Sequence, residues 1–265
     1  MTIVRVHVVS DVHGNAEALA RAGEGADALL VLGDLLNFVD YADYSGGILG
    51  AVFGPEKVAR FAHLRNHGRP GEAGAYARSL WASLREPERV IEEAVREQYA
   101  KIFAALTAPT YATPGNVDAP ALWAEFAGEH VYVLDGQVVE LGGLRLGFVG
   151  GAVLPPGGRL VRNSPWVPYL RTSAEYGEVV AALGEVDVLC SHIPPAVVEL
   201  TYDVVARREE IGSPHLLEAI RRGQPRWSLF GHVHQPLARR TRIGRTECIN
   251  VGYFRRTERP FVLRW

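Results

Sequence analysis

Short apolar runs that end in polar residues recur along the chain and predict buried β-strands. Residues 3–9 and 28–32 are almost continuously apolar, and a polar cluster follows each run, as in strands that are covered on both faces. Between them, Asn15 can cap a helix from Ala16 to about Ala22. Further strands are expected at residues 110–113, 131–133, 138–141, 144–149, 186–191 and 227–230, with three more in the tail 237–265. This alternation of strands and helices predicts an α/β fold.

Two turn signals predict that part of the sheet structure is antiparallel. Asp135-Gly136 lies between apolar runs, and Gly142-Gly143 lies between the expected strands 138–141 and 144–149. Both dipeptides are typical of tight β-hairpin turns. A purely parallel, doubly wound sheet is therefore not expected.

Residues 37–106 interrupt the alternation and predict a helical insertion. The stretch lacks a clear strand pattern, and Gly46-Gly47 and the glycines within 68–74 are typical of helix breaks. Helical patterns are expected near residues 55–64, 75–84 and 87–106. In the last of these, Pro87 occupies a first-turn position. Its apolar residues recur at helical spacing, at Ile91, Val95, Ile102 and Leu106. We expect one domain over residues 1–265 that contains this insertion.

The composition narrows the class of protein. The net charge is −2 and 48% of the residues are hydrophobic, which disfavours both a disordered chain and a stable complex with nucleic acid. Lys57 and Lys101 are the only lysines, so arginine carries nearly all of the positive charge. A bias of this kind more often follows genome composition than an anion site, although guanidinium groups suit phosphate where they line a cleft.

The two cysteines and the first residues predict a cytoplasmic protein. Cys190 and Cys248 form no C-x-x-C pair, which argues against a thiolate zinc site or a disulfide framework and fits a reducing compartment. The N-terminal residues have the pattern of a strand and not of a signal peptide. No apolar run approaches the roughly 20 residues that span a bilayer, so no membrane association is expected.

Five short segments, each next to an expected strand end or in a loop, carry residues that can bind metal ions. They are Asp11-Val12-His13, Gly33-Asp34, Gly115-Asn116-Val117-Asp118, Ser191-His192 and Gly231-His232-Val233-His234. Loops that follow the carboxyl ends of strands meet at one edge of an open α/β sheet, so segments far apart in the sequence can form one site. Imidazole and carboxylate together suit Mn, Fe, Zn or Ni, and the lack of thiolates disfavours a structural zinc site.

Taken in order, these segments resemble the calcineurin-like metallophosphoesterase superfamily, whose pattern is D-x-H, G-D, G-N-H-[DE], H and G-H-x-H. The resemblance extends from Asp11 to His234 and leaves the insertion and the C-terminal strands without a motif. It implies a four-layer αββα sandwich, in which two mixed β-sheets are flanked by helices. It also implies a centre of two divalent metal ions at one edge, with manganese expected first and iron, zinc or nickel as alternatives.

The resemblance assigns a role to each motif residue. One metal ion would be held by Asp11, His13 and His234, and the other by Asn116, His192 and His232. Asp34 would bridge the two ions and act in catalysis together with a metal-bridging hydroxide, which would attack phosphorus.

Position 117 departs from the family pattern. Val117 stands where the family usually has a histidine that protonates the leaving oxygen, and Asp118 would orient that residue. Proton donation would then come from elsewhere or be dispensable, and His67 in the insertion is our candidate acid. The remaining histidines are expected at the surface or packed in the core, namely His7, His63, His130 and His215.

The insertion follows Asp34 and is a candidate lid over the substrate. Its residues that could reach a substrate are Asn37, Tyr41, Tyr44, Arg60 and Arg65. An additional helical layer or a dimer contact is an equally good interpretation. Asn15 could contact phosphate, although helix capping is the safer assignment.

These observations together favour a metal-dependent phosphoester hydrolase. A phosphodiesterase is preferred because the leaving-group histidine is missing, and the substrate would be a small phosphoester, with nucleotide-like compounds as one option. The alternatives are a phosphomonoesterase or protein phosphatase, a nuclease, and a non-catalytic scaffold of the same fold. Balanced charge disfavours the nuclease, and a full set of ligand side chains disfavours the scaffold.

Overall fold

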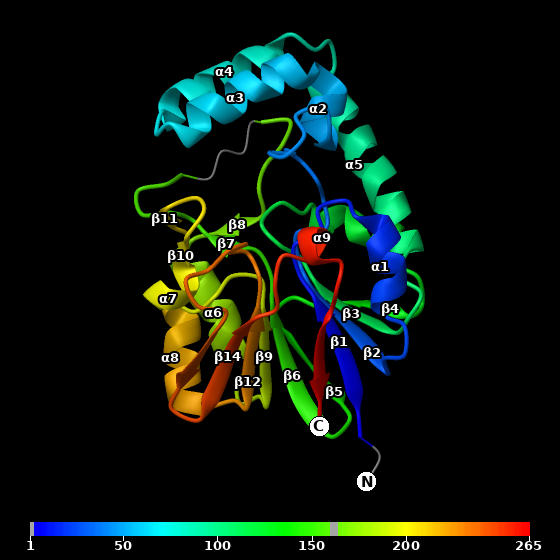
Figure 1. Ribbon diagram of the computed structural model, residues 1–265, viewed down its shortest axis with the longest axis vertical. Coiled ribbons are helices and arrows are strands. Elements are labelled where there is room, and N and C mark those ends of the chain that lie inside the picture. Colours follow the sequence, from blue (N-terminus) through cyan, green and yellow to red (C-terminus); the bar gives the residue numbers. More distant parts are fainter. Residues whose placement is uncertain (1–2, 160–163) are drawn as a thin grey trace.

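Two mixed β-sheets pack face to face in the computed structural model, which describes residues 3–159 and 164–265 (Figure 1). The first sheet has the order β15-β1-β2-β3-β4, in which only β15 runs antiparallel to its neighbour. Its strands are β1 (Arg5–Val9), β2 (Ala28–Leu32), β3 (Thr110–Thr113), β4 (Val131–Val133) and β15 (Phe261–Arg264). This sheet thus presents the carboxyl ends of four parallel strands at one edge.

The second sheet has the order β13-β14-β12-β9-β6-β5, with an antiparallel strand at each side and parallel strands between them. Its strands are β5 (Gln137–Leu141), β6 (Leu144–Val149), β9 (Val188–Ser191), β12 (Trp227–Phe230), β13 (Arg240–Ile243) and β14 (Thr246–Asn250). Both sheets are mixed, which confirms the expectation from the turn signals and the resemblance.

Successive residues of a strand belong to different cores because their side chains point to opposite faces of the sheet. Val8 and Leu30 lie in the core between the two sheets, together with Phe148 of β6. Val9 and Leu29, their neighbours in sequence, lie instead in the core between the first sheet and its helices. This double burial explains why these strands are apolar almost without interruption.

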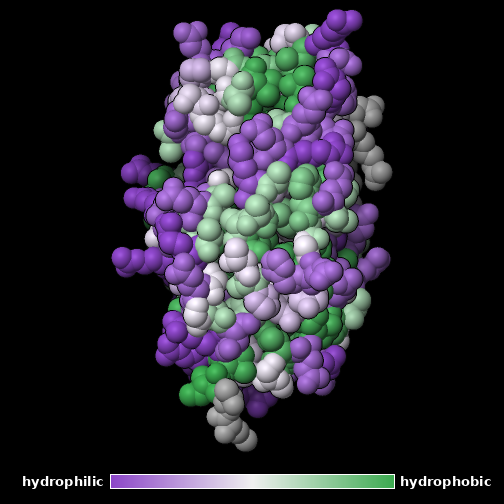
Figure 2. Space-filling model, turned by 90° about the vertical axis from the view of Figure 1, so that its right-hand side faces the viewer, coloured by the Kyte–Doolittle hydropathy of each residue, from purple (hydrophilic) through white to green (hydrophobic). Residues whose placement is uncertain are grey.

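Helices cover the outer face of each sheet and complete the four layers. The first sheet is covered by α1 (Ala16–Ala22) and α5 (Pro87–Ala104), and the second by α6 (Ser173–Ala182) and α8 (Pro214–Gly223) (Figure 1). Figure 2 views the side of α1 and α5, where hydrophilic residues surround smaller hydrophobic patches. The exposed side of α5 carries ion pairs such as Lys101–Glu97, one helical turn apart.

The insertion is helical, as expected, and it shares a core with the first sheet. It contains α2 (Gly47–Phe53), α3 (Pro55–Asn66), α4 (Pro70–Ala82) and α5, with α3 and α4 above the upper edge of both sheets in Figure 1. The predicted break within 68–74 is confirmed at Gly68, which lies between α3 and α4, whereas Gly71 and Gly74 lie inside α4; Gly46-Gly47 mark the start of α2. A glycine costs a helix only about 1 kcal/mol. Ile48, Leu49 and Phe53 are buried in the core between the first sheet and its helices, which we call the outer core, and this burial outweighs that cost.

One of the two hairpin predictions is confirmed and the other is wrong. Gly142-Gly143 connects β5 to β6, which pair antiparallel. At Asp135-Gly136 the chain instead passes from β4 in the first sheet to β5 in the second. A turn signal reports a local change of direction, whereas the choice of sheet depends on distant strands.

Shorter elements make up the connections. These are the 3-10 helix Pro120–Glu125, β7 (Ala152–Val153), β8 (Leu170–Arg171), α7 (Val198–Thr201), β10 (Tyr202–Asp203), β11 (Arg208–Glu209) and α9 (Phe254–Thr257). Within residues 3–159 and 164–265, none of the helices has both the length and the apolar character needed to cross a membrane.

Candidate metal centre

The predicted metal ligands gather where strands of both sheets end. Backbone hydrogen bonds hold their loops together: Asp11 N–H donates to Gly33 O at 3.0 Å, and His13 N–H donates to Asp34 O at 2.9 Å. The two sheets are joined in the same way, because His232 N–H donates to Oδ2 of Asp11 at 2.9 Å. Segments from β1, β2 and β12 therefore meet at one edge.

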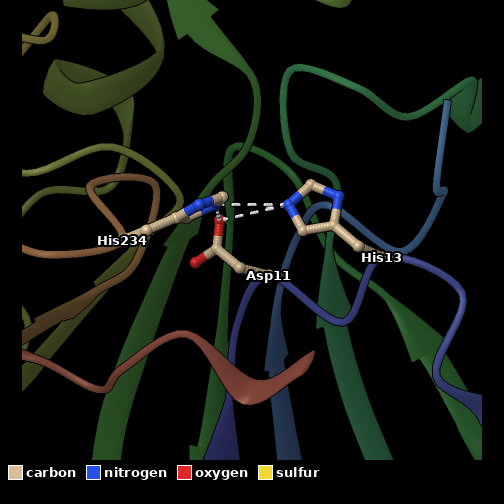
Figure 3. A group of neighbouring side chains, drawn as sticks. All are labelled: Asp11, His13 and His234. Atoms are coloured by element: carbon tan, nitrogen blue, oxygen red, sulfur yellow. Dashed lines mark hydrogen bonds and ion pairs between the residues drawn. The ribbon is translucent and has the colours of Figure 1, made fainter. Parts of the chain in front are cut away.

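Asp11, His13 and His234 form one group of converging donor atoms (Figure 3). Nε2 of His13 lies 3.3 Å from Nε2 of His234. Oδ1 of Asp11 lies 3.4 Å from Nε2 of His234 and 3.9 Å from Nε2 of His13. In Figure 3 the two imidazoles approach from opposite sides, with the Asp11 carboxylate between them. Three donor atoms from distant parts of the chain thus face a common point.

Asp34 lies between this group and a second one. Its Oδ2 is 3.8 Å from Nε2 of His13, and its Oδ1 is 3.5 Å from Nε2 of His192. Nε2 of His192 also lies 3.0 Å from Oδ1 of Asn116. The ring of His232 packs edge to face against that of His192, with centroids 5.1 Å apart. Each oxygen of Asp34 thus faces a different histidine, as a bridging carboxylate requires.

Backbone carbonyls orient two of these imidazoles. Nδ1 of His13 lies 3.0 Å from Leu36 O, and Nδ1 of His192 lies 2.8 Å from Leu32 O. A carbonyl oxygen only accepts hydrogen bonds, so Nδ1 must carry the proton in both rings. Nε2 then presents a lone pair to the acidic residues, which is the usual arrangement of histidines that bind metal ions.

These residues fit divalent metal ions. Oδ1 of Asp11 is buried and has no well-formed hydrogen bond among the described residues, which is costly for a carboxylate oxygen unless a cation neutralises it. Nε2 of His13 also lies close to Nε2 of His234, and a cation bound by both nitrogen atoms would stabilise this arrangement. The donors are imidazole, carboxylate and amide oxygen, and they suit Mn, Fe, Zn or Ni.

The backbone at the site is strained at several of the predicted ligands. Asp11, His13, Asp34 and His232 have φ of 58°, 41°, 54° and 66°, in the left-handed region that side chains disfavour. Such strain concentrates at functional sites, where surrounding structure compensates for it. Gly231 has a different role, because a Cβ there would overlap Oγ of Ser10 and Oδ2 of Asp11. This motif glycine thus permits the close approach of two loops.

The charges within the site shift the pKa values of its ligands in different directions. Burial lowers the pKa of His232 to about 4, and the neighbouring His192 adds to this effect. Burial also lowers the pKa of His13 despite the opposing charge of Asp34. Burial by itself would lower the pKa of His234. The hydrogen bond to Asp11 and the negative charge of Asp11 outweigh burial and raise this pKa. Two imidazoles are therefore neutral at pH 7, while His234 holds its proton more tightly.

Metal binding should depend on pH because the ligands must lose protons. The raised pKa of His234 means that protons compete with the metal ion as pH falls from 8 towards 6. We expect Mn²⁺ affinity to fall by about tenfold per pH unit below the pKa of His234. Calorimetric titration in buffers of different ionisation enthalpy measures both the affinity and the proton release.

The matched control for this titration is His67→Ala, which removes an exposed histidine of the insertion and should leave the pH profile unchanged. Mn²⁺ affinity that stays constant between pH 8 and pH 6, without proton release, would contradict the prediction.

Asp118 and Val117 form hydrogen bonds that hold the ligand-bearing loops in place. Asp118 is buried, and its Oδ1 accepts hydrogen bonds from Leu35 N–H and Tyr99 O–H at 3.0 and 3.3 Å, while Oδ2 accepts from Gly115 N–H at 2.8 Å. Burial, reinforced by the charge of Asp34, raises the pKa of Asp118. The backbone N–H of Val117 donates to Oδ1 of Asp34 at 2.8 Å. Asp118 therefore connects the loops that carry the ligands.

The proposed acid and substrate residues differ in where the structure places them. His67 follows α3, where its Nδ1 bonds to His63 O and its ring stacks on His63 at the turn into α4. No described contact joins it to the metal ligands. Arg60 lies over the ring of Tyr76 within the α3–α4 hairpin, and Arg65 and Tyr41 are exposed.

Asn15 and Asn37 have local roles that the contacts define. Oδ1 of Asn15 accepts a hydrogen bond from Ala18 N–H at 3.0 Å, which confirms the helix cap. Asn37 is buried, and its Nδ2 donates to Asp40 at 3.1 Å. Tyr44 packs against the outer core. The other histidines have partners too, since His7 bonds to Ala22 O, His130 to Leu106 O and His215 to Ser173.

Sequence reasoning missed Tyr253. Its ring stacks on His234 with centroids 3.8 Å apart and meets the edge of His13 at 5.8 Å. It therefore restrains two of the predicted ligands. Tyr253 lies outside the sequence motifs. The sequence hints at a turn only through the preceding Gly252, which has a φ of 104° in the structure.

Two groups of imidazole and carboxylate donors thus lie at the edge of a four-layer sandwich, where they could hold metal ions. The chain belongs to the calcineurin-like phosphoesterase family, whose model matches residues 4–236. Membership supports metal-dependent phosphoester hydrolysis.

Solved structures share the fold at low identity. One crystal structure aligns with 96% of this chain and 92% of its own, with a TM-score of 0.59 and 18% identity. The protein TT1561 of Thermus thermophilus aligns over 99% of both chains, with a TM-score of 0.53 and 16% identity. These likenesses concern the fold alone. No curated protein matches the chain.

Proposed function

We propose that this protein is a phosphodiesterase that hydrolyses small phosphoesters with two divalent metal ions. The observation that carries the proposal is the position of Asp34, whose two oxygens face His13 and His192 at 3.8 and 3.5 Å. A carboxylate placed in this way can bind two cations at once and partly neutralise both. The proposal also treats the chain as one domain, because the insertion shares a core with the first sheet.

The side chains form two sets of ligands, one for each metal ion. Asp11, His13 and His234 would hold one ion, and Asn116, His192 and His232 would hold the other. When bound, the ions supply a water-derived nucleophile near neutral pH and offset negative charge on the phosphate oxygens. The chain's own contribution is to keep its imidazoles neutral and oriented, through Leu32 O and Leu36 O. Manganese suits this mixed donor set, and we propose it as the native metal.

Hydrolysis of bis-p-nitrophenyl phosphate with Mn²⁺ tests this function directly. The proposal requires turnover of this diester, at a higher rate than that of p-nitrophenyl phosphate. Absence of hydrolysis with Mn²⁺, Fe²⁺, Zn²⁺ and Ni²⁺ alike, in protein that binds these metals, would exclude the activity. A faster reaction of the monoester would reverse the assignment of substrate class.

The lack of a histidine at position 117 should make the rate depend on the leaving group. Val117 packs against the outer core and has no proton to donate, so an alkoxide leaves unprotonated. We expect rates to fall steeply as the pKa of the leaving alcohol rises across a series of aryl and alkyl diesters. General acid catalysis typically contributes about 10²- to 10⁴-fold, and this sets the size of the loss.

The measurement is the slope of log kcat against leaving-group pKa, and Val117→His is the informative variant. A histidine there should flatten the slope by raising the rates of alkyl esters more than those of aryl esters. A flat slope in the unmodified protein would show that another residue donates the proton.

A further inference from the structure

An open pocket of ≈ 370 Å³ lies beside His234. We call it the arginine pocket, and its lining residues are His234, Gln235, Arg239, Tyr253, Arg256 and Thr257. Its walls come from the segment around α9 and from the loop between β12 and β13, which also carries the Gly231–His234 motif. The volume falls at the lower end of the range, about 300 to 1,000 Å³, of pockets that bind small molecules.

The charge of the arginine pocket is positive and not neutralised by the residues that line it. Neither Arg239 nor Arg256 has a side-chain hydrogen bond or ion pair with any residue in the described part of the chain, and both are exposed. None of the lining residues is acidic. The nearest acid in sequence, Glu258, instead accepts a hydrogen bond from Asn15 Nδ2 at 3.1 Å.

The arginines of α5 differ from this pair. Arg96 pairs with Glu92 and Glu125, and Arg89 pairs with Glu86 and Glu93. Those guanidinium groups already have carboxylate partners along or beside α5. Two guanidinium groups without partners that line one pocket can bind an anion from solution.

His234 places the arginine pocket next to the candidate metal centre. Its Nε2 faces Oδ1 of Asp11 at 3.4 Å, and its ring stacks on Tyr253, which also lines the pocket. One imidazole therefore contributes to both the metal site and the pocket. A substrate whose reacting phosphate lies beside Asp11 would extend past His234 towards Arg239 and Arg256.

We propose that the arginine pocket binds a second phosphate group of the substrate. The substrate class is then phosphodiesters that carry an additional phosphate, and nucleoside bisphosphates are product-like compounds that present both phosphate groups. A phosphate offers several oxygens to two guanidinium groups, and Gln235 and Thr257 supply further hydrogen-bond donors. The inference rests on the proposed function, since it takes the metal centre as the place of the reacting phosphate.

The test compares the binding of adenosine 3′,5′-bisphosphate and adenosine 5′-monophosphate to the Mn²⁺-loaded protein by calorimetry. We expect the bisphosphate to bind at least about tenfold more tightly at low salt. The double variant Arg239→Ala/Arg256→Ala should bring the two affinities to within about twofold of each other. Added salt should reduce the preference, because exposed charges are screened within about 10 Å at 0.1 M.

The matched control is Arg222→Ala, which removes an exposed arginine of α8, and it should keep the preference for the bisphosphate. Equal affinities in the unmodified protein, or a preference that survives in the double variant, would overturn the proposal.

The hydrolysis assay separates this result from the proposed function. Turnover of bis-p-nitrophenyl phosphate without a bisphosphate preference would refute the arginine pocket alone. A preference that is lost in the double variant would support the pocket as a phosphate site, even if the protein hydrolysed none of the test esters.

Discussion

Asp34→Asn should reduce the hydrolysis of bis-p-nitrophenyl phosphate with Mn²⁺ by about 10³-fold or more, because a bridging carboxylate contributes several kcal/mol to charge neutralisation. The amide retains the shape of the side chain, and its oxygen can still accept the hydrogen bond from Val117 N–H. Its NH₂ group would then take the place of Oδ2 and face His13. An NH₂ group donates hydrogen bonds and cannot bind a cation in place of a carboxylate oxygen.

The readouts are kcat, the metal content of the purified protein, and the thermal unfolding transition. Glu17→Gln is the matched control, since it makes the same chemical change at a carboxylate that is 90% exposed on α1. We expect this control to retain full activity. A well-folded Asp34→Asn protein with wild-type turnover would show that the proposed mechanism is wrong.

Gly231→Ala should abolish metal binding although it changes no ligand. The new methyl group would overlap Oγ of Ser10 and Oδ2 of Asp11, and both residues are buried. Oδ2 of Asp11 accepts the hydrogen bond from His232 N–H that joins the two sheets at the site. Either Asp11 or the loop of His232 must therefore move. Overpacking of this kind typically costs about 1–3 kcal/mol of stability.

Mn²⁺ binding by calorimetry and the free energy of unfolding in urea are the two measurements. Gly71→Ala is the matched control, because a Cβ there meets nothing within 4 Å and α4 should tolerate or gain from alanine. If Gly231→Ala binds Mn²⁺ with unchanged affinity, the close packing at this glycine is not needed for the metal centre.

Much of the fold could be predicted from local patterns. Strands such as 28–32 are apolar throughout because both faces of their sheet are covered, and this signal is strong in the sequence. The start of α5 at Pro87 followed from a first-turn proline. The start of α2 at Gly47 could not be predicted, since tertiary burial of its apolar residues overrides the low helix propensity of glycine.

The candidate site, like the fold, could be predicted only in part from the sequence. Its potential ligands were recognisable because their residue types, their order and their position after strands are all local features. The distances between these ligands could not be predicted. Asp11 and His232, for example, are 221 residues apart in the chain and meet through a hydrogen bond between loops of different sheets. The stacking of Tyr253 on His234 also depends on how the C-terminal segment folds back.

By itself, the sequence determined which side chains could bind metal ions, and it determined that strands alternate with helices around an insertion. Only the tertiary structure decided that Asp135-Gly136 crosses between sheets and that Asp118 is buried against backbone amides. It also decided that Arg239 and Arg256 share one pocket. The physical reason is that propensity and hydrophobic pattern act between near neighbours, whereas burial and charge at a site depend on segments brought together by packing.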